Sequence, residues 1–309
     1  MHGIFLLGRR TKYVCPHRQD SVFVKLGEKS LRAFDLTETI IAMNSASYSA
    51  WLWRREYDFS NYIHRLNFRC LKFLDDRSLD QSEMDFVGMI HRTETHLCFL
   101  DGWCKRNPKN YQVWFHRRWL VDRMYECNPN TRDELLQNEL AAVADHLSLE
   151  SKNCNAWSHR LFLANRFALL QCDSEIVFTS KHIDLDVRNN SAWSYRRHMV
   201  GGRISLFDSE LEYCLEKIAL APGNESPWVY MRSIPGWNTN PSVQDFCERM
   251  VNSSSRISGS LLQRRDCAET LIAVYKDRGD STAARSLLDR LHSADHIRSP
   301  YFGYLLNAS

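Results

Sequence analysis

One element returns five times along the chain: an asparagine, replaced by serine in the first copy, stands four residues before a tryptophan, and an arginine follows. The copies read SYSAWLWRR (47–55), NYQVWFHRR (110–118), NCNAWSHRL (153–161), NNSAWSYRR (189–197) and NESPWVYMR (224–232). Their tryptophans are Trp51, Trp114, Trp157, Trp193 and Trp228, separated by 63, 43, 36 and 35 residues. The later intervals are close to the roughly 34 residues of a tetratricopeptide-like pair of helices. No other feature constrains the fold as strongly.

Each copy predicts the start of a helix. An asparagine in this place can accept hydrogen bonds from backbone N–H groups two or three residues later, which caps the helix. In the first four copies the arginine follows the tryptophan by three residues, so both side chains project from one face. Segments 134–151 and 209–222 carry apolar residues at intervals of three and four, which is typical of amphipathic helices. Only residues 21–26 (SVFVKL) alternate like a strand.

These patterns predict an all-α fold, a right-handed superhelix (solenoid) of tetratricopeptide-like helical hairpins in which each hairpin buries its apolar face against its neighbours. We expect residues 28–309 to form it, and residues 1–27 to be an atypical N-terminal segment and a candidate for disorder. The long first interval contains residues of helical character at 61–91, which we interpret as an insertion. A solenoid of this kind offers a long concave surface to a partner.

Composition excludes several classes of function. Forty Lys and Arg against 37 Asp and Glu leave a net charge of +3, too little to indicate a nucleic-acid or membrane partner. The first apolar run, in MHGIFLLGRR, is shorter than a signal peptide requires, and no stretch approaches the roughly 20 apolar residues of a membrane span. The ten cysteines form no Cys-x-x-Cys pair, so we expect reduced thiols, no metal site and a cytoplasmic protein.

Five equivalent elements cannot all be active sites. We therefore expect the tryptophans and the arginines Arg117, Arg160 and Arg196 to be structural, with each arginine stem lying along its tryptophan in a cation–π contact. Differences between the copies are the place to look for function.

The second copy alone places Lys109, Tyr111 and Gln112 at one helix start. A helix N-terminus favours anions, and a lysine there adds a mobile charge suited to a phosphate. Gln112 could donate N–H groups to a carboxylate. We expect an anionic ligand at this cluster, the alternative being a solvated helix start.

The five copies, together with PKNYQVW (108–114), DVRNNSAW (186–193) and PGNESPW (222–228), resemble the α subunit shared by protein farnesyltransferase and protein geranylgeranyltransferase type I. The resemblance runs from about Glu28 to ADHIRSPYFGYLL (294–306). It implies a heterodimer in which the α subunit wraps a catalytic β subunit. The β subunit would supply the zinc ion that activates the acceptor thiol and most of the isoprenoid pocket, and magnesium would accompany the isoprenoid diphosphate. This chain alone would be inactive.

The resemblance also implies roles for individual residues. Lys109 matches a catalytic lysine that reaches the isoprenoid diphosphate and would neutralise charge on the leaving group. Gln112 matches the residue that binds the C-terminal carboxylate of a Cys-aliphatic-aliphatic-X (CaaX) substrate, and Tyr111 lines the same region. In the third copy the family usually has Tyr-His where this chain has Cys154 and Asn155. Asn155 is therefore a candidate substrate contact with altered chemistry, because its amide is neutral where histidine can carry charge.

Two alternatives compete with a CaaX prenyltransferase. One is the α subunit of the Rab geranylgeranyltransferase or a related α-repeat protein, which shares the repeat but typically has a small residue in place of Gln112. The other is a non-catalytic helical-repeat scaffold. The presence of Lys109, Tyr111 and Gln112 together argues against a scaffold, which has no need of them.

Overall fold

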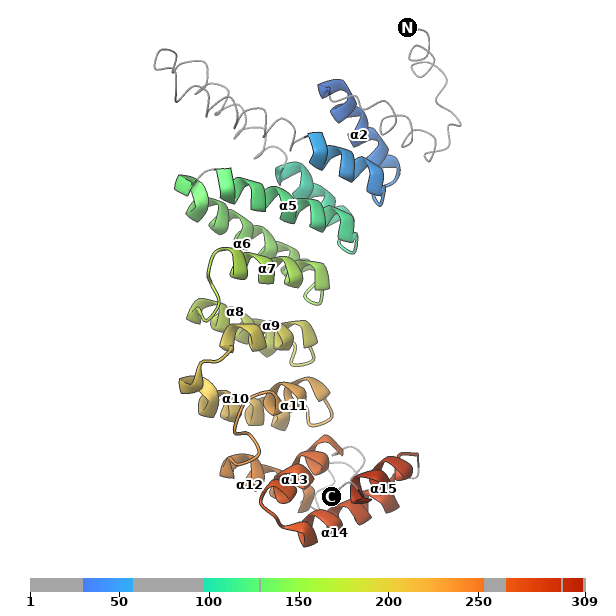
Figure 1. Cartoon of the computed structure of the whole chain (residues 1–309), viewed down its shortest axis with the longest axis vertical. Helices are drawn as coiled ribbons and strands as arrows, with labels where there is room; N and C mark the ends of the chain where they lie inside the picture. Colours follow the sequence, from blue (N-terminus) through green and yellow to red (C-terminus); the bar gives the residue numbers. More distant parts are fainter. Residues whose placement is uncertain (1–29, 58–96, 128, 253–264, 296, 308–309) are drawn as a thin grey trace. The chain divides into compact units, whose positions relative to one another are not determined.

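The computed structural model describes residues 30–57, 97–127, 129–252, 265–295 and 297–307 (Figure 1). Helices dominate this part of the chain, and it contains no β-strand. The chain divides into two compact units, which meet in sequence between Phe167 and Ala168. Three predicted features lie outside the described residues: the alternating segment 21–26, the N-terminal segment 1–27 and the insertion at 61–91.

The first unit consists of helical hairpins that coincide with the first three copies of the repeat. Its helices are α2 (Leu31–Met43), residues 48–57, residues 97–106, α5 (Tyr111–Cys127), the short 3-10 helix η1 (Pro129–Thr131), α6 (Arg132–Leu149) and α7 (Cys154–Arg166). Helix α5 packs against both α6 and α7, so the second helices of successive hairpins are neighbours (Figure 1). The long interval between Trp114 and Trp157 reflects the lengths of α5 and α6, which have 17 and 18 residues.

The second unit continues the same scheme. Its helices are α8 (Asp173–Leu185), α9 (Asn190–Val200), the 3-10 helix η2 (Ile204–Leu206), α10 (Phe207–Leu220), α11 (Glu225–Arg232), α12 (Pro241–Asn252), α13 (Arg265–Asp277), α14 (Ser281–Ala294) and α15 (Ser299–Asn307). Helix α11 packs against α9 and α13, the second helices of the hairpins on either side. The hairpins α12–α13 and α14–α15 extend the stack although neither contains the tryptophan element.

The predicted helix caps are confirmed. Asn153, Asn189 and Asn224 precede α7, α9 and α11, and the side-chain oxygen of each accepts a hydrogen bond from a backbone N–H in the first turn. In the first two copies Ser47 Oγ accepts from the Ala50 N–H, and Asn110 Oδ1 accepts from the Gln112 N–H. These bonds satisfy donors that a helix start otherwise leaves without a partner.

The tryptophans form a second repeated contact, which joins consecutive copies. All five are at most 4% exposed, and each indole Nε1–H donates to the carbonyl six residues earlier: that of Ser45, Pro108, Ser151, Val187 or Pro222. Three of these carbonyls also accept from the asparagine Nδ2 of the following copy: Ser45 from Asn110, Pro108 from Asn153, and Val187 from Asn224. One carbonyl therefore serves two copies, which the sequence pattern did not predict.

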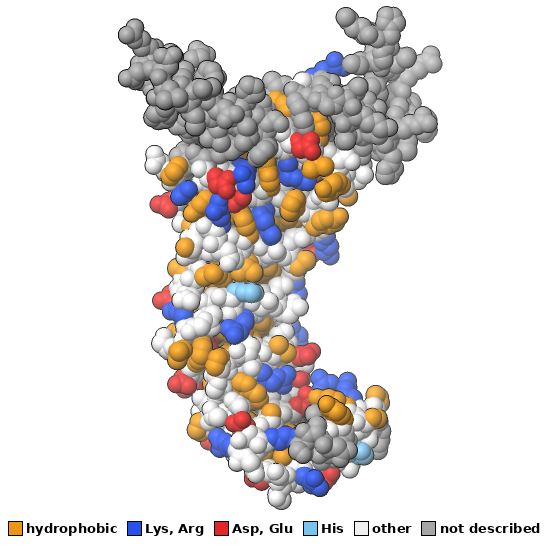
Figure 2. Space-filling model, viewed as in Figure 1, with side chains coloured by type: hydrophobic (Ala, Val, Ile, Leu, Met, Phe, Trp, Pro, Cys, Tyr) orange, Lys and Arg blue, Asp and Glu red, His pale blue; other side chains and the backbone are white. Residues whose placement is uncertain are grey.

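The predicted all-α fold of stacked hairpins is thus confirmed. Its right-handed superhelical course depends on how the two units are placed, and stays a prediction. Acidic, basic and hydrophobic side chains are intermingled over α5 and α6 on the face shown in Figure 2. None of the described helices is long and apolar enough to cross a membrane.

Candidate functional site at the start of helix α5

The turn that precedes α5 carries the first of the predicted site residues. The Asn110 N–H donates to the Asn107 carbonyl at 3.0 Å, which closes the turn, and the Trp114 indole holds the Pro108 carbonyl at 3.0 Å. Lys109 lies between these two fixed points. These two hydrogen bonds fix the backbone position of Lys109, and they do not involve its side chain.

The side chain of Lys109 is highly exposed. Its exposed fraction is 84%, and its Nζ lies 3.4 Å from Oε1 of Glu150, the residue that follows α6. Exposed ion pairs of this kind contribute about 0–1 kcal/mol. Such a weak pair leaves the ammonium group able to exchange Glu150 for an anionic ligand.

Tyr111 and Gln112 are adjacent in sequence but lie in different environments. Tyr111 is 65% exposed at the first position of α5, whereas Gln112 is 6% exposed. The backbone N–H of Gln112 is capped by Asn110, and its side-chain amide makes no hydrogen bond to another described residue. Gln112 is therefore largely covered as a residue, and its amide has donors that the described residues do not use.

Asn155 meets the same turn from the next hairpin. Its Nδ2 donates to the Pro108 carbonyl at 3.3 Å, beside Asn153 Nδ2 at 2.9 Å. Cys154, the first residue of α7, is exposed. Asn155 thus contacts Pro108, the residue that precedes Lys109 in the sequence. The role of Asn155 as a substrate contact stays a prediction.

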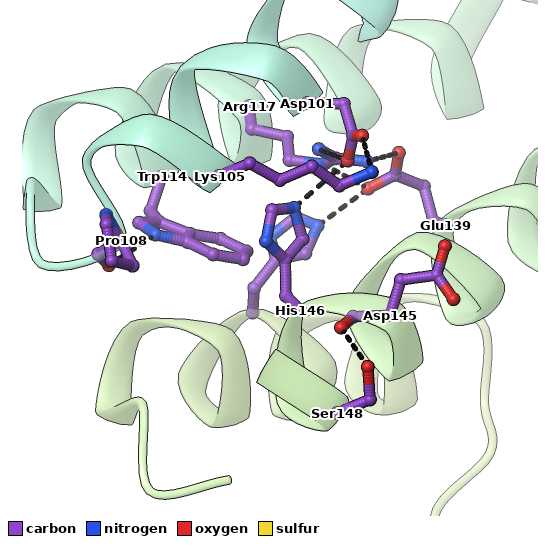
Figure 3. Close-up of polar contacts among 10 residues, drawn as sticks. Asp101, Lys105, Pro108, Trp114, Arg117, Glu139, Asp145, His146 and Ser148 are labelled. Atoms are coloured by element: carbon purple, nitrogen blue, oxygen red, sulfur yellow. Dashed lines mark hydrogen bonds and ion pairs between the residues drawn. The ribbon is translucent and has the colours of Figure 1, made fainter. Parts of the chain in front are cut away.

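A largely buried charge cluster lies beside the Trp114 ring (Figure 3). Arg117 donates from Nε and Nη2 to the two carboxylate oxygens of Glu139, at 2.9 and 2.8 Å, and from Nη1 to Asp101 at 3.2 Å. His159 Nε2 lies 2.8 Å from Glu139 Oε2. The expectation that Arg117 lies along its tryptophan is wrong, because two carboxylates hold the guanidinium.

Asp101 connects this cluster to the surface. Its Oδ1 lies 3.0 Å from His146 Nε2, and its Oδ2 lies 2.8 Å from the Nζ of Lys105. The hydrogen bond from His146, helped by Lys105 and Arg117 against the effect of burial, holds the pKa of Asp101 well below its usual range. The Trp114 ring packs edge-on against His146, with 5.0 Å between ring centres. The helix that follows Lys109 is therefore anchored on a polar cluster in which Arg117, Asp101 and Glu139 are all paired (Figure 3).

The central carboxylate of the cluster stays ionised. Burial alone would raise the pKa of Glu139, but the charge of Arg117 and the hydrogen bonds from His159 and Arg117 lower it to about 2. Burial lowers the pKa of His159 although Glu139 acts in the opposite direction, so this imidazole is neutral in the fold. The pKa of Arg117 is raised because Glu139 outweighs the effect of its burial.

The second unit contains the same arrangement. Arg196 donates to both oxygens of Glu210, at 2.7 and 2.6 Å, and Tyr230 donates its hydroxyl to Glu210 at 2.6 Å. The guanidinium of Arg196 lies over the Tyr213 ring at 4.3 Å, so the expected stacking on Trp193 is wrong here too. Arg160 is 4% exposed, and its Nη1 donates to the Leu140 carbonyl at 3.5 Å.

A sequence signal for these clusters was available and was missed. A glutamate stands 18 residues before the tryptophan in the last three copies, and a histidine or tyrosine stands two residues after it. These residues are Glu139 with His159, Glu175 with Tyr195, and Glu210 with Tyr230, and each pair is hydrogen bonded.

The donors for a metal ion are not gathered in the described part of the chain. No group of three His, Cys, Asp or Glu side chains there could hold one. Seven described cysteines are free thiols, of which Cys104, Cys214, Cys247 and Cys267 are buried. The described side chains at the start of α5 supply an ammonium group, a phenol and an amide.

Known proteins share this architecture. The family described as "Protein prenyltransferase alpha subunit repeat" matches residues 30–57, 93–124, 136–167, 172–201 and 207–235. The geranylgeranyl transferase type-2 subunit alpha of Sus scrofa is 27% identical over 153 residues, 50% of this chain and 22% of that protein. That of Dictyostelium discoideum is 25% identical over 146 residues, 46% of this chain and 39% of that protein. The aligned region thus spans well under half the length of these curated relatives.

A solved structure matches much more of the chain. The Candida albicans protein geranylgeranyltransferase-I complexed with GGPP gives a TM-score of 0.69 at 26% identity, covering 94% of this chain and 87% of that one. The family match covers all five tryptophan elements and spans both units. The chain belongs to the family of protein prenyltransferase alpha subunit repeat proteins.

Proposed function

We propose that this chain is the α subunit of a heterodimeric CaaX protein prenyltransferase. With a β subunit it would support transfer of a farnesyl or geranylgeranyl group from the diphosphate to a cysteine thiol near the C-terminus of a substrate protein. The observation that carries the proposal is the exposed Lys109 beside Gln112 at one helix start, in a chain that is similar over 94% of its length to a protein geranylgeranyltransferase-I.

Lys109 is the catalytic residue in this proposal. As the bond between the isoprenoid carbon and the diphosphate oxygen breaks, negative charge grows on the diphosphate, and a nearby ammonium group stabilises that charge. The fixed turn and the mobile side chain suit this role, because the backbone is placed by Pro108 and Asn110 while the ammonium can leave Glu150.

The remaining site residues would bind substrate. Gln112 would donate its amide N–H to the peptide carboxylate, which fits a largely buried residue whose amide makes no bond to the described part of the chain. Tyr111 would cover the same ligand with its exposed ring. Asn155 would contact the diphosphate through the Nδ2 hydrogen that does not bond to the Pro108 carbonyl.

The metals of the reaction would not be held by this chain. The described residues offer no suitable cluster, so the proposal places zinc on the β subunit, where it would activate the acceptor thiol, and magnesium with the diphosphate. The setting would be the cytoplasm.

A second candidate is the α subunit of a type-2 geranylgeranyltransferase, because the curated relatives carry that name. Those matches cover at most half of this chain. Gln112 favours the CaaX type, since only a substrate read through its terminal carboxylate needs that donor.

Co-expression with each candidate β subunit from the same organism tests the proposal. The purified pairs are assayed for zinc-dependent transfer of radiolabelled farnesyl or geranylgeranyl to a CaaX peptide, with each chain alone as the control. Transfer by a pair and by neither chain alone is expected. A stable pair that modifies only a Rab-type protein would establish the second candidate, and failure to pair with any β subunit would leave a scaffold.

A further inference from the structure

Arg55, the last residue of the first copy, is a buried cation that forms no ion pair with a carboxylate of the described residues. It is 7% exposed, its Nη1 is shielded from solvent, and it makes no hydrogen bond or ion pair within the described part of the chain. Its guanidinium carbon lies 4.9 Å from the centre of the Phe115 ring and 6.0 Å from that of Tyr48. Two aromatic rings thus flank a charge that the described residues do not hold in an ion pair. Burial lowers the pKa of Arg55, although the charge of the neighbouring Glu56 acts in the opposite direction.

The other copies show what this position normally does. Arg118, Arg197 and Arg232 also stand four residues after the repeat tryptophan. Arg118 donates to Ser158, Arg197 to the Gly201 carbonyl, and Arg232 to Thr270, all within 3.2 Å. Arg55 differs from all three, although it is the most buried of the four.

The surface around Arg55 is apolar and exposed. Tyr48, Tyr111 and Phe115 are 57%, 65% and 51% exposed. Tyr111 and Phe115 are four residues apart on α5 and therefore share one face of that helix. We call Tyr48, Arg55, Tyr111 and Phe115 the aromatic patch. Exposed aromatic rings around a desolvated arginine are the usual composition of an energetic centre in a protein interface.

The charge of Arg55 specifies what can cover the patch. A guanidinium offers five N–H donors and no acceptor, and its fork matches a carboxylate in a bidentate pair. Burying the patch under a purely apolar surface would leave these donors without any partner, at a cost that opposes binding. The complementary surface therefore needs an acceptor among apolar side chains, and an aspartate or glutamate matches both the charge and the fork of the guanidinium.

We infer that the aromatic patch is a docking anchor for the β subunit, in which an acidic side chain of that subunit enters between Tyr48 and Phe115 and pairs with Arg55. The inference rests on the proposed function, which supplies the partner. Tyr111 belongs both to the patch and to the candidate site, so docking here would place the β subunit against the turn that carries Lys109.

Two substitutions of Arg55 test the anchor in the co-expressed pair. Arg55→Met keeps an apolar stem and removes the charge, and we expect the Kd for the β subunit to rise at least about tenfold. Arg197→Met, at the equivalent position of the fourth copy, should change it less than about threefold because Arg197 is bonded within its own chain. Arg55→Lys supplies a primary amine that a carbodiimide can couple to a carboxylate in direct contact, so mass spectrometry should find the R55K side chain joined to one acidic residue of the β subunit.

The possible results distinguish failure of the Arg55 anchor from failure of the proposed function. A complex whose Kd is unchanged by Arg55→Met overturns the anchor and leaves the proposed function standing. A weakened complex in which the R55K side chain is never coupled to the β subunit also overturns it, because Arg55 would then act within its own chain. Failure of the unaltered chain to bind any β subunit overturns the proposed function and the anchor together.

Discussion

Arg117 and Glu139 face each other inside the first unit, with Nη2 and Oε1 2.8 Å apart and both side chains 2% exposed. The carboxylate comes from the first helix of the following hairpin, so the pair joins two copies of the repeat. Because neither group can reach solvent, each depends on the other for its charged state.

Removing one member of this pair should destabilise the chain severely. Arg117→Met leaves Glu139 buried with only His159 as its partner, and we expect the free energy of unfolding to fall by about 3–5 kcal/mol. Urea denaturation of the purified protein measures this change. As a control, Arg203→Met removes the pair with the exposed Asp173 and a bond to the Gln171 carbonyl, and should cost only about 1–2 kcal/mol. Equal losses for the two variants would contradict the assignment.

Stability should decrease as the pH falls below about 6.5, in part because of His159. Its pKa is lowered by burial, so the unfolded chain takes up a proton at a pH where the folded chain does not, and protonation favours unfolding. His159→Gln can keep a donor toward Glu139 without titrating. We expect the loss of unfolding free energy between pH 7 and pH 5 to shrink in this variant by at most about 2 kcal/mol. An unchanged or steeper loss would show that His159 does not titrate in this way.

Lys109→Ala should lower turnover by about 100-fold or more while changing the affinity for a CaaX peptide little, because its interaction strengthens only as the diphosphate departs. Steady-state and peptide-binding measurements on the complex with the β subunit give both quantities. Lys105→Ala is the matched control, since this lysine is also exposed and paired with a carboxylate. The assignment fails if turnover survives, or if both lysine variants lose it equally.

Gln112→Ala should weaken peptide binding by about tenfold and leave turnover at saturating peptide nearly unchanged, since a bond present before and during the reaction contributes mainly to binding. Ser226→Ala alters the equivalent position of the fifth copy and serves as the control. Unaltered affinity of the Gln112 variant for peptides with a free C-terminal carboxylate would remove the residue from the site.

Asn224→Ala should cost more than the loss of an ordinary cap. The variant loses the bond from the Ser226 N–H and the bond to the Val187 carbonyl, for which we expect about 2 kcal/mol. Asp280→Ala loses only the cap of α14, worth about 1 kcal/mol. Urea denaturation compares the two, and equal costs would mean that the bond between copies contributes nothing.

The sequence predicted the hairpins because capping and helical periodicity are local properties. It did not predict that Glu139 and Glu210 are buried, because an acidic residue in an amphipathic helix normally faces solvent. Their burial depends on an arginine from the preceding hairpin, a contact between segments that periodicity does not encode. The hairpins α12–α13 and α14–α15 lie within the predicted range 28–309, but their boundaries were not predicted because they keep the packing without the tryptophan.

The candidate site was predictable only in part. Lys109 and Tyr111 are exposed as a ligand site requires, but nothing in the sequence indicated that Gln112 is buried beside them. Likewise, the replacement of Tyr-His by Cys154 and Asn155 indicated a substrate contact with altered chemistry, but not that Asn155 donates to the backbone of the neighbouring turn. The burial of Gln112 and the bond of Asn155 both depend on which side of the helix start packs against the neighbouring hairpin.

The carbonyl shared by successive copies restricts how such a chain can change its length during evolution. Duplicating or deleting a whole copy can preserve a shared carbonyl, because its tryptophan lies in the same copy and its asparagine in the copy that follows. An insertion inside those six residues would separate the tryptophan from its acceptor and remove the acceptor from the next asparagine in the same event. Tolerated insertions should therefore fall between the hairpin elements, and growth of the array should proceed by complete modules.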